Sequence, residues 1–185
     1  LISIAISTYL IRSEYQIAFF LNKFFGKFFM KPIKKQSEYG QKAYKIIFLG
    51  YHQNATSLFE FANKKGRFKL PETLVVDYRY AIQDQIKSFG SDVFYGDISN
   101  PHTLEAAGVA HAQVVICCID DFLLKGTSNL RLLEACKHLN PDIKFIGTAN
   151  DVKTEFDLTQ NGVFAVHNPS NEAAPGLFKK ITSAI

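Results

Sequence analysis

Cysteine is scarce in this chain, and its spacing does not suit metal binding or redox exchange. The 185 residues include three cysteines, Cys117, Cys118 and Cys136, which form no C-x-x-C pair and no zinc-binding pattern. The adjacent Cys117 and Cys118 would point to opposite faces of a strand. We therefore expect small buried side chains in a reducing compartment, and no metal site.

The N-terminus lacks an apolar run long enough to cross a membrane. Residues 1–11 are apolar apart from small hydroxyl side chains and end at Arg12, whereas a membrane-spanning helix needs about 20 residues. The run could be the end of a transmembrane helix or a short core or interfacial helix. No basic region precedes it and no small-residue cleavage site follows, which argues against a secretory signal. Because the first residue is leucine, we expect a longer protein.

The body of the chain lacks an excess of positive charge. Residues 1–44 carry seven basic and two acidic side chains, whereas the remaining 141 residues carry fourteen basic and fifteen acidic ones. A nucleic-acid-binding domain would need a basic face on its folded body, so we expect no nucleic-acid partner. A basic N-terminal segment instead fits a position just inside a membrane.

The segment that follows the apolar run has the pattern of an amphipathic helix. Phenylalanine recurs every four residues from Phe20 to Phe28, and Lys23 and Lys27 recur at the same step. Aromatic residues flanked by lysines suit the cytoplasmic surface of a membrane. A soluble helix that packs on the domain or on a partner is the alternative. Residues 31–43, with proline, glycine and few apolar side chains, are typical of a linker.

Short apolar runs then alternate with helical patterns, and this alternation predicts the fold. Strands are expected at Lys45–Leu49, Thr73–Val76, Asp92–Tyr95, Gln113–Cys118, Lys144–Thr148 and Val163–Val166. Helices are expected at Asn54–Lys65, Ala81–Phe89, Pro101–Ala107, Ser128–Leu139, Val152–Gln160 and from Asn171 onward. Such a sequence indicates an α/β protein with a Rossmann-like, doubly wound parallel sheet of six strands in the order 3-2-1-4-5-6.

The turn after the first strand lacks the second glycine of the dinucleotide-binding fingerprint G-x-G-x-x-G/A. With Gly50 as the first position, His52 stands at the second and Ala55 at the third. The second glycine lets backbone amides approach a pyrophosphate, and a Cβ with an imidazole obstructs that approach. We therefore expect that this turn does not hold the pyrophosphate of NAD(H) in the usual way.

Acidic residues follow several strands at the edge where a nucleotide would bind. Asp77 ends the second strand, where Rossmann domains place the acid that accepts hydrogen bonds from ribose hydroxyls. Tyr78 could stack on a base and Arg79 could reach a phosphate. Gly96 and Asp97 close the third strand at the same edge. The alternative for Asp77 is a solvated turn residue, and the alternative for Asp97 is an ordinary polar loop residue.

The stretch YGDISNPHTLEAAGV (95–109), followed by AQVVI (112–116), resembles the GD-x-x-x-P-x-x-L-x-x-AG signature of TrkA-N domains. These are the nucleotide-binding halves of RCK domains, the regulators of potassium conductance. The likeness extends over about Tyr44 to Pro169. Residues 7–11, before the aromatic basic helix, resemble the end of the membrane domain of Kef-type cation:proton antiporters.

The resemblance implies a non-enzymatic cytoplasmic regulatory domain that forms a homodimer. It would bind an adenine nucleotide and gate a potassium or other monovalent cation:proton antiporter, whose transmembrane domain belongs to the same chain at the inner membrane. The implied organisation is a transmembrane or membrane-surface helix (1–30), a linker (31–43), the RCK/TrkA-N Rossmann domain (44–170) and a dimerisation or crossover helix (171–185).

The resemblance also assigns roles to individual residues. It implies phosphate contacts for Gly50, Tyr51 and His52, and it places the ribose on Asp77. It places adenine beside Asp97 and Ile98, and the nucleotide above Cys118 and Ile119.

Because His52 replaces a glycine, we expect AMP or ATP as the ligand, with NAD(H) as the other candidate. Two different functions stay open. One is a dimerisation module that has lost nucleotide binding. The other is a nicotinamide-dependent oxidoreductase, although no Tyr-x-x-x-Lys pair follows the fourth strand and no catalytic residues are expected.

Overall fold

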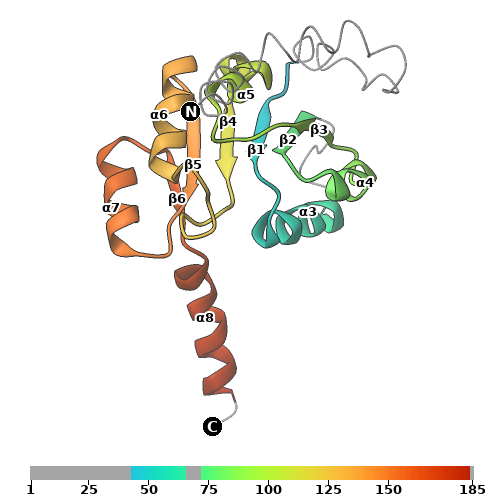
Figure 1. Ribbon diagram of the computed structural model, residues 1–185. Coiled ribbons are helices and arrows are strands. Elements are labelled where there is room, and N and C mark those ends of the chain that lie inside the picture. The colour runs from blue at the N-terminus through green and yellow to red at the C-terminus, as the bar shows by residue number, and fades with distance from the viewer. Residues whose placement is uncertain (1–42, 66–71, 184–185) are drawn as a thin grey trace, which may run out of the picture. The chain divides into compact units, whose positions relative to one another are not determined.

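Six parallel strands form one sheet in the order β3-β2-β1-β4-β5-β6, as predicted (Figure 1). The computed structural model describes residues 43–65 and 72–183, all within one compact unit, Ser37–Ile185. The strands are β1 (Ile46–Leu49), β2 (Thr73–Asp77), β3 (Asp92–Tyr95), β4 (Val114–Cys117), β5 (Lys144–Thr148) and β6 (Ala165–His167). The expected fold class is therefore confirmed.

Helices cover both faces of the sheet. They are α3 (Gln53–Lys65), α4 (Gln83–Ser88), α5 (Pro101–Ala106), α6 (Asn129–Leu139), α7 (Val152–Gln160) and α8 (Pro169–Thr182), with short 3₁₀ turns η3 (Tyr80–Ile82) and η4 (Val109–His111). Buried side chains of α3 and α4 pack on one face, and those of α5, α6 and α7 pack on the other. The strands are consequently apolar on both sides, as in other doubly wound sheets.

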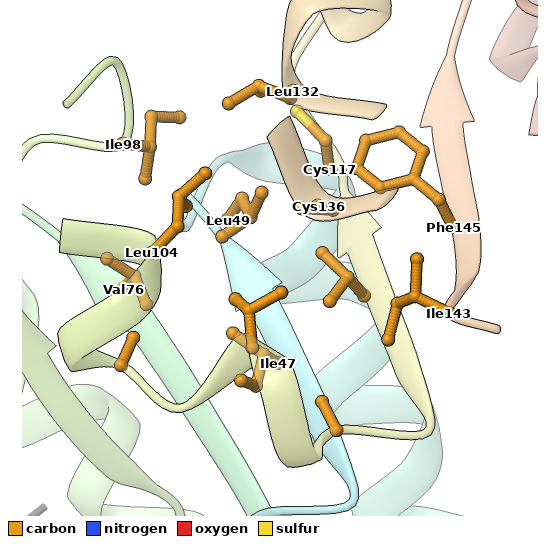
Figure 2. Close-up of a cluster of buried hydrophobic side chains, with 14 of the residues drawn as sticks. Ile47, Leu49, Val76, Ile98, Leu104, Cys117, Leu132, Cys136, Ile143 and Phe145 are labelled. Atoms are coloured by element: carbon orange, nitrogen blue, oxygen red, sulfur yellow. The ribbon is translucent and has the colours of Figure 1, made fainter. Parts of the chain in front are cut away.

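The alternation of side chains along the strands divides the core into two clusters. Ile47 and Leu49 of β1 lie in the cluster shown in Figure 2, together with Leu104 of α5 and Leu132 of α6. Phe48 points to the other face, where it packs with side chains of α3 and α4. This two-sided burial is the reason why β1 is a continuous apolar run.

The cysteines follow the same alternation. Cys117 belongs to the first cluster and Cys118 to the second, so the two lie on opposite faces as expected. All three thiols are buried and free of disulfide bonds. Burial raises the pKa of the Cys118 and Cys136 thiols to about 12, so they stay protonated near neutral pH. The prediction of small, buried cysteine side chains is confirmed.

Local capping explains where several helices begin. The Asn100 side chain accepts a hydrogen bond from the His102 amide at 3.0 Å, with Pro101 in the first turn of α5. Asn168 caps α8 in the same way, through the Asn171 amide at 3.0 Å, with proline at the start of the helix. Helix α8 therefore begins at Pro169, two residues earlier than the sequence pattern indicated.

Two other expected elements were wrong in helix type or by two residues, whereas the remaining bounds lie within one residue of expectation. The helix expected at Ala81–Phe89 is a 3₁₀ turn, η3, followed by the short α4. Strand β6 covers Ala165–His167 instead of Val163–Val166. The Val163 amide donates to the Leu158 carbonyl at 3.1 Å, which closes the end of α7 and delays the start of the strand.

The C-terminal helix exposes its apolar side chains. Every residue of α8 from Ser170 to Thr182 is exposed, including Leu177 (61%), Phe178 (69%) and Ile181 (51%). Among residues 43–65 and 72–183, no helix is long and apolar enough to cross a bilayer. The expected N-terminal helix and most of the expected linker lie outside the described residues.

Candidate functional site

A cavity of about 610 Å³ opens at the carboxyl edge of the sheet. Strands β2 and β3 lie on one side of β1, and β4, β5 and β6 lie on the other. The strand order therefore reverses at β1. In open α/β sheets, ligands bind in the crevice at this reversal. The cavity is lined by Gly50, His52, Val76, Asp77, Tyr78, Arg79, Asp97, Ile98, Ile119, Leu123, Leu124 and Lys125. Eight of the eleven site residues expected from sequence are among them.

Glycine is required at the first turn by both its backbone and its surroundings. Gly50 has a φ of 78°, a left-handed conformation that side chains disfavour. A Cβ at this position would lie 2.1 Å from Cδ1 of Ile119. The Gly50 amide donates to the Val76 carbonyl at 2.8 Å, which ties the turn to β2. Ile119 therefore packs directly against the first turn and gives the cavity an apolar wall.

The two residues after Gly50 face different environments. The Tyr51 ring is buried and packs edge-on against Phe59, with ring centroids 5.4 Å apart. Burial raises the pKa of the Tyr51 hydroxyl. His52 is half-buried and lines the cavity. The side chain available to a phosphate at this turn is therefore that of His52, whereas Tyr51, although expected at the site, is not among the residues that line the cavity.

Asp77 is the most constrained polar side chain of the site. Its side chain is 3% exposed and forms an ion pair with Arg79, with Oδ2 and Nη2 3.0 Å apart. Oδ2 also accepts the Tyr51 amide at 2.8 Å, which joins the end of β2 to the first turn. The hydrogen bonds to Asp77 raise the pKa of the Arg79 guanidinium above its ordinary value. Asp77 lies at the expected position, already paired with a neighbouring cation.

Three other expected residues of the cavity, Tyr78, Asp97 and Ile98, differ in their exposure. Tyr78 lines the cavity with 62% of its surface exposed, so its ring is free to meet a flat ligand. Asp97 is exposed at the other wall, where its Oδ1 accepts the Ser99 amide at 2.9 Å. Ile98 is buried beside it.

Gly96 and Cys118 do not line the cavity. Gly96 serves the fold, because a Cβ there would lie 2.5 Å from Cγ2 of Thr103 on α5. Its amide donates to the Asp77 carbonyl at 3.2 Å, which joins the end of β3 to β2. The Cys118 side chain is buried in the α3 side of the core. The expected contacts of these two residues with a nucleotide stay predictions.

Sequence reasoning missed the loop that closes the cavity after β4. Leu123, Leu124 and Lys125 come from this loop and supply both apolar surface and a cation. The loop has no hydrophobic periodicity, so pattern analysis gives no position for its side chains. The Lys125-Gly126 pair next to two leucines is the one signal that could have drawn attention to it.

A fully buried asparagine anchors this loop to the sheet. Asn129, at the start of α6, donates from Nδ2 to the Ile119 carbonyl at 2.9 Å and to Oδ1 of Asp121 at 2.7 Å. Its Oδ1 accepts the amide of Thr148 at the end of β5, at 3.0 Å. One side chain therefore links the ends of two strands and one end of the loop that lines the cavity.

The cavity combines an apolar wall with one buried acid, one exposed acid (Asp97) and three basic side chains, those of His52, Arg79 and Lys125. This combination suits an anionic ligand that also has a flat or apolar part. In the part of the chain that the structure describes, no group of three or more His, Cys, Asp or Glu side chains could hold a metal ion.

Comparison with known sequences gives one family and several relatives. The TrkA-N domain profile matches residues 46–169. The glutathione-regulated potassium-efflux system protein KefC of Enterobacter sp. (strain 638) is 35% identical over 122 residues, 64% of this chain and 18% of that protein. The KefC protein of Escherichia coli O139:H28 is 34% identical over the same length. The chain thus spans less than a fifth of these relatives.

Solved structures share the fold. The TrkA-N domain of inner membrane protein ybaL from Escherichia coli has a TM-score of 0.61 at 19% identity, covering 74% of this chain and 96% of that one. The Shewanella denitrificans Kef CTD in its AMP-bound form has a TM-score of 0.56 at 22% identity, covering 75% and 79%. The GsuK channel bound to NAD has a TM-score of 0.56 at 17% identity, covering 90% and 29%.

Replacing Asn129 tests how the loop is anchored. We expect Asn129→Ala to lower the free energy of unfolding by about 3 kcal/mol, because it leaves the Thr148 amide and the Ile119 carbonyl without their partner. Urea denaturation measures the change. Asn150→Ala is the matched control, since Asn150 is exposed. Equal stability of the two variants would contradict this role of Asn129.

Proposed function

Since the chain belongs to the TrkA-N domain family, we propose that it is a nucleotide-sensing regulatory domain of a Kef-type cation:proton antiporter. The observation that carries this proposal is the cavity at the reversal of strand order, with Asp77 at the end of β2. This is the position at which Rossmann-like domains bind the ribose of a nucleotide. The similarity to KefC supports potassium efflux as the regulated process.

The proposed ligand is an adenine nucleotide, with AMP or ATP favoured over NAD(H). In this arrangement Asp77 accepts the ribose hydroxyls, while the exposed ring of Tyr78 stacks on a base. Asp97 and Ile98 would flank the adenine, and Ile119 would lie beneath the nucleotide. The AMP-bound state of the Shewanella denitrificans Kef CTD shows that a protein of this fold takes such a ligand.

The phosphate would lie at the first turn. The N-terminus of α3 begins at Gln53, directly after the turn, and favours a negative charge there. His52 lines the cavity where a Cβ and a ring reduce the access of a phosphate to the backbone. This arrangement favours one displaced phosphate group over a pyrophosphate bound along the turn.

The rest of the chain would connect the sensor to its transporter. We place residues 1–30 at or in the membrane, 31–43 as a linker, 44–170 as the sensor and 171–185 as a dimerisation helix. The exposed Leu177, Phe178 and Ile181 of α8 support a homodimer. An inner-membrane location with the sensor on the cytoplasmic side would follow from attachment to an antiporter domain.

A dimerisation module without a ligand is the second candidate. The observation that favours it is the pairing of Asp77 with Arg79, which already satisfies the acid that a ribose would need. An oxidoreductase has less support, because no Tyr-x-x-x-Lys pair follows β4. We therefore propose a binding function and not an enzymatic one.

Thermal unfolding with added nucleotides separates these functions. We expect AMP at about one hundred times its dissociation constant to stabilise the chain by about 2.7 kcal/mol, because the ligand binds only the folded state. For a chain of this size the melting temperature would rise by roughly 5 to 10 °C. Guanosine monophosphate is the control for adenine recognition. No response to AMP, ADP, ATP, NAD⁺ or NADH at millimolar concentration would favour the module without a ligand.

Substitution of His52 tests the choice between one phosphate and a pyrophosphate. We expect His52→Gly to strengthen NAD⁺ binding relative to AMP, because it removes the Cβ and the ring from the turn. His52→Ala removes the ring and keeps the Cβ, so it separates the two causes. Isothermal titration calorimetry measures both affinities. An unchanged ratio of NAD⁺ to AMP affinity in His52→Gly would refute the role of this residue.

A further inference from the structure

The carboxylate of Asp77 has no position left for another hydrogen-bond donor. Oδ1 accepts the Arg79 amide at 2.8 Å and the Arg79 Nε–H at 3.1 Å. Oδ2 accepts the Tyr51 amide at 2.8 Å and the Arg79 Nη2–H at 3.0 Å. An ionised carboxylate offers about four acceptor positions. A ribose hydroxyl can therefore bind Asp77 only if one of these donors leaves.

The four donors are not equally easy to displace. The Tyr51 and Arg79 amides belong to the backbone of two turns, and the Tyr51 ring is buried. The guanidinium stands at the end of a rotatable side chain that is 41% exposed, against 3% for Asp77. The two guanidinium bonds are therefore the ones that a ligand can replace, and they occupy the place that two ribose hydroxyls would take.

The same guanidinium reaches the first turn. Its Nη2 also donates to the Tyr51 carbonyl, one residue after Gly50. Arg79 thus bridges the end of β2 and the turn at which a phosphate would lie. A guanidinium released from Asp77 would stay close to this turn, inside a cavity that His52 and Lys125 also line.

We propose that Arg79 occupies the ribose position of the site and that a ligand enters by moving the guanidinium from Asp77 onto its own phosphate. This inference rests on the proposed function and specifies its ligand class, which is a 5′-phosphorylated nucleoside such as AMP. Adenosine would have to replace the charge-assisted contact between Arg79 and Asp77 with hydrogen bonds from neutral hydroxyls, and it offers the released guanidinium no anionic partner. A phosphate replaces the lost carboxylate with a charge-assisted, two-pronged contact.

Titration of the 185-residue chain with AMP and adenosine tests the exchange. We expect wild-type protein to bind AMP more tightly than adenosine. In Arg79→Gln, adenosine should bind more tightly than in wild type and AMP more weakly, so the preference for AMP should fall by roughly tenfold to a hundredfold. Arg131→Gln is the matched control, because Arg131 is exposed and lines a separate cavity. Its preference should equal that of wild type.

The outcomes separate the exchange from the proposed function. If wild type binds AMP and Arg79→Gln keeps the same preference, the exchange is refuted and nucleotide sensing stands. If Arg79→Gln binds adenosine and the wild-type protein does not bind adenosine, the exchange is supported. If neither protein binds AMP or adenosine, nucleotide sensing fails, and the exchange fails with it.

A measurement on wild-type protein covers the case in which Arg79→Gln does not fold. The chain has four arginines, so the ¹⁵N–¹H spectrum of their Nε–H groups is simple. The Arg79 signal, assigned with Arg79→Lys, should shift when AMP is added, because the guanidinium changes its acceptor. An Arg79 signal that stays in place at saturating AMP would overturn the exchange.

Discussion

The carboxylate of Asp77 holds the carboxyl edge of the sheet together. It lies at the end of β2 and fixes the first turn through the Tyr51 amide, while it also fixes its own turn through the Arg79 amide. A buried charge of this kind is stable only when hydrogen-bonded and paired. Together with the hydrogen bond from the Gly50 amide to the Val76 carbonyl, this side chain sets the position of the first turn relative to β2.

Two further contacts give the cavity its shape. Ile119 packs so closely against Gly50 that no side chain fits at position 50. Asn129 connects the carbonyl of Ile119 to Thr148 at the end of β5, and it also holds Asp121 at the start of the loop after β4. The backbone around the cavity is consequently well fixed, whereas the basic side chains at its walls are exposed or half-buried. Selectivity between nucleotides can then arise from these basic side chains without any rearrangement of the sheet.

Most of the fold could be predicted from the sequence, because its strands are short apolar runs with helices between them. The bounds of β3, β5 and α7 agree with expectation, and Asn100-Pro101 marked the start of α5. The predicted site residues converge because the carboxyl ends of parallel strands share one edge. The rest depended on tertiary contacts. Whether Arg79 turns toward Asp77 or into the cavity is a rotamer choice, the ring of Tyr51 is buried by packing against Phe59, and Lys125 lies on a loop without periodicity.

The backbone around the cavity is fixed, whereas the Arg79 guanidinium that pairs with Asp77 can move. Nucleotide binding therefore depends on the contacts of Asp77. A crystal structure of the chain grown with AMP examines that point directly. We expect the ribose hydroxyls to donate to Asp77 and the Arg79 guanidinium to contact the phosphate beside the first turn. AMP bound elsewhere, or bound in this cavity with Arg79 still paired to Asp77, would contradict this arrangement.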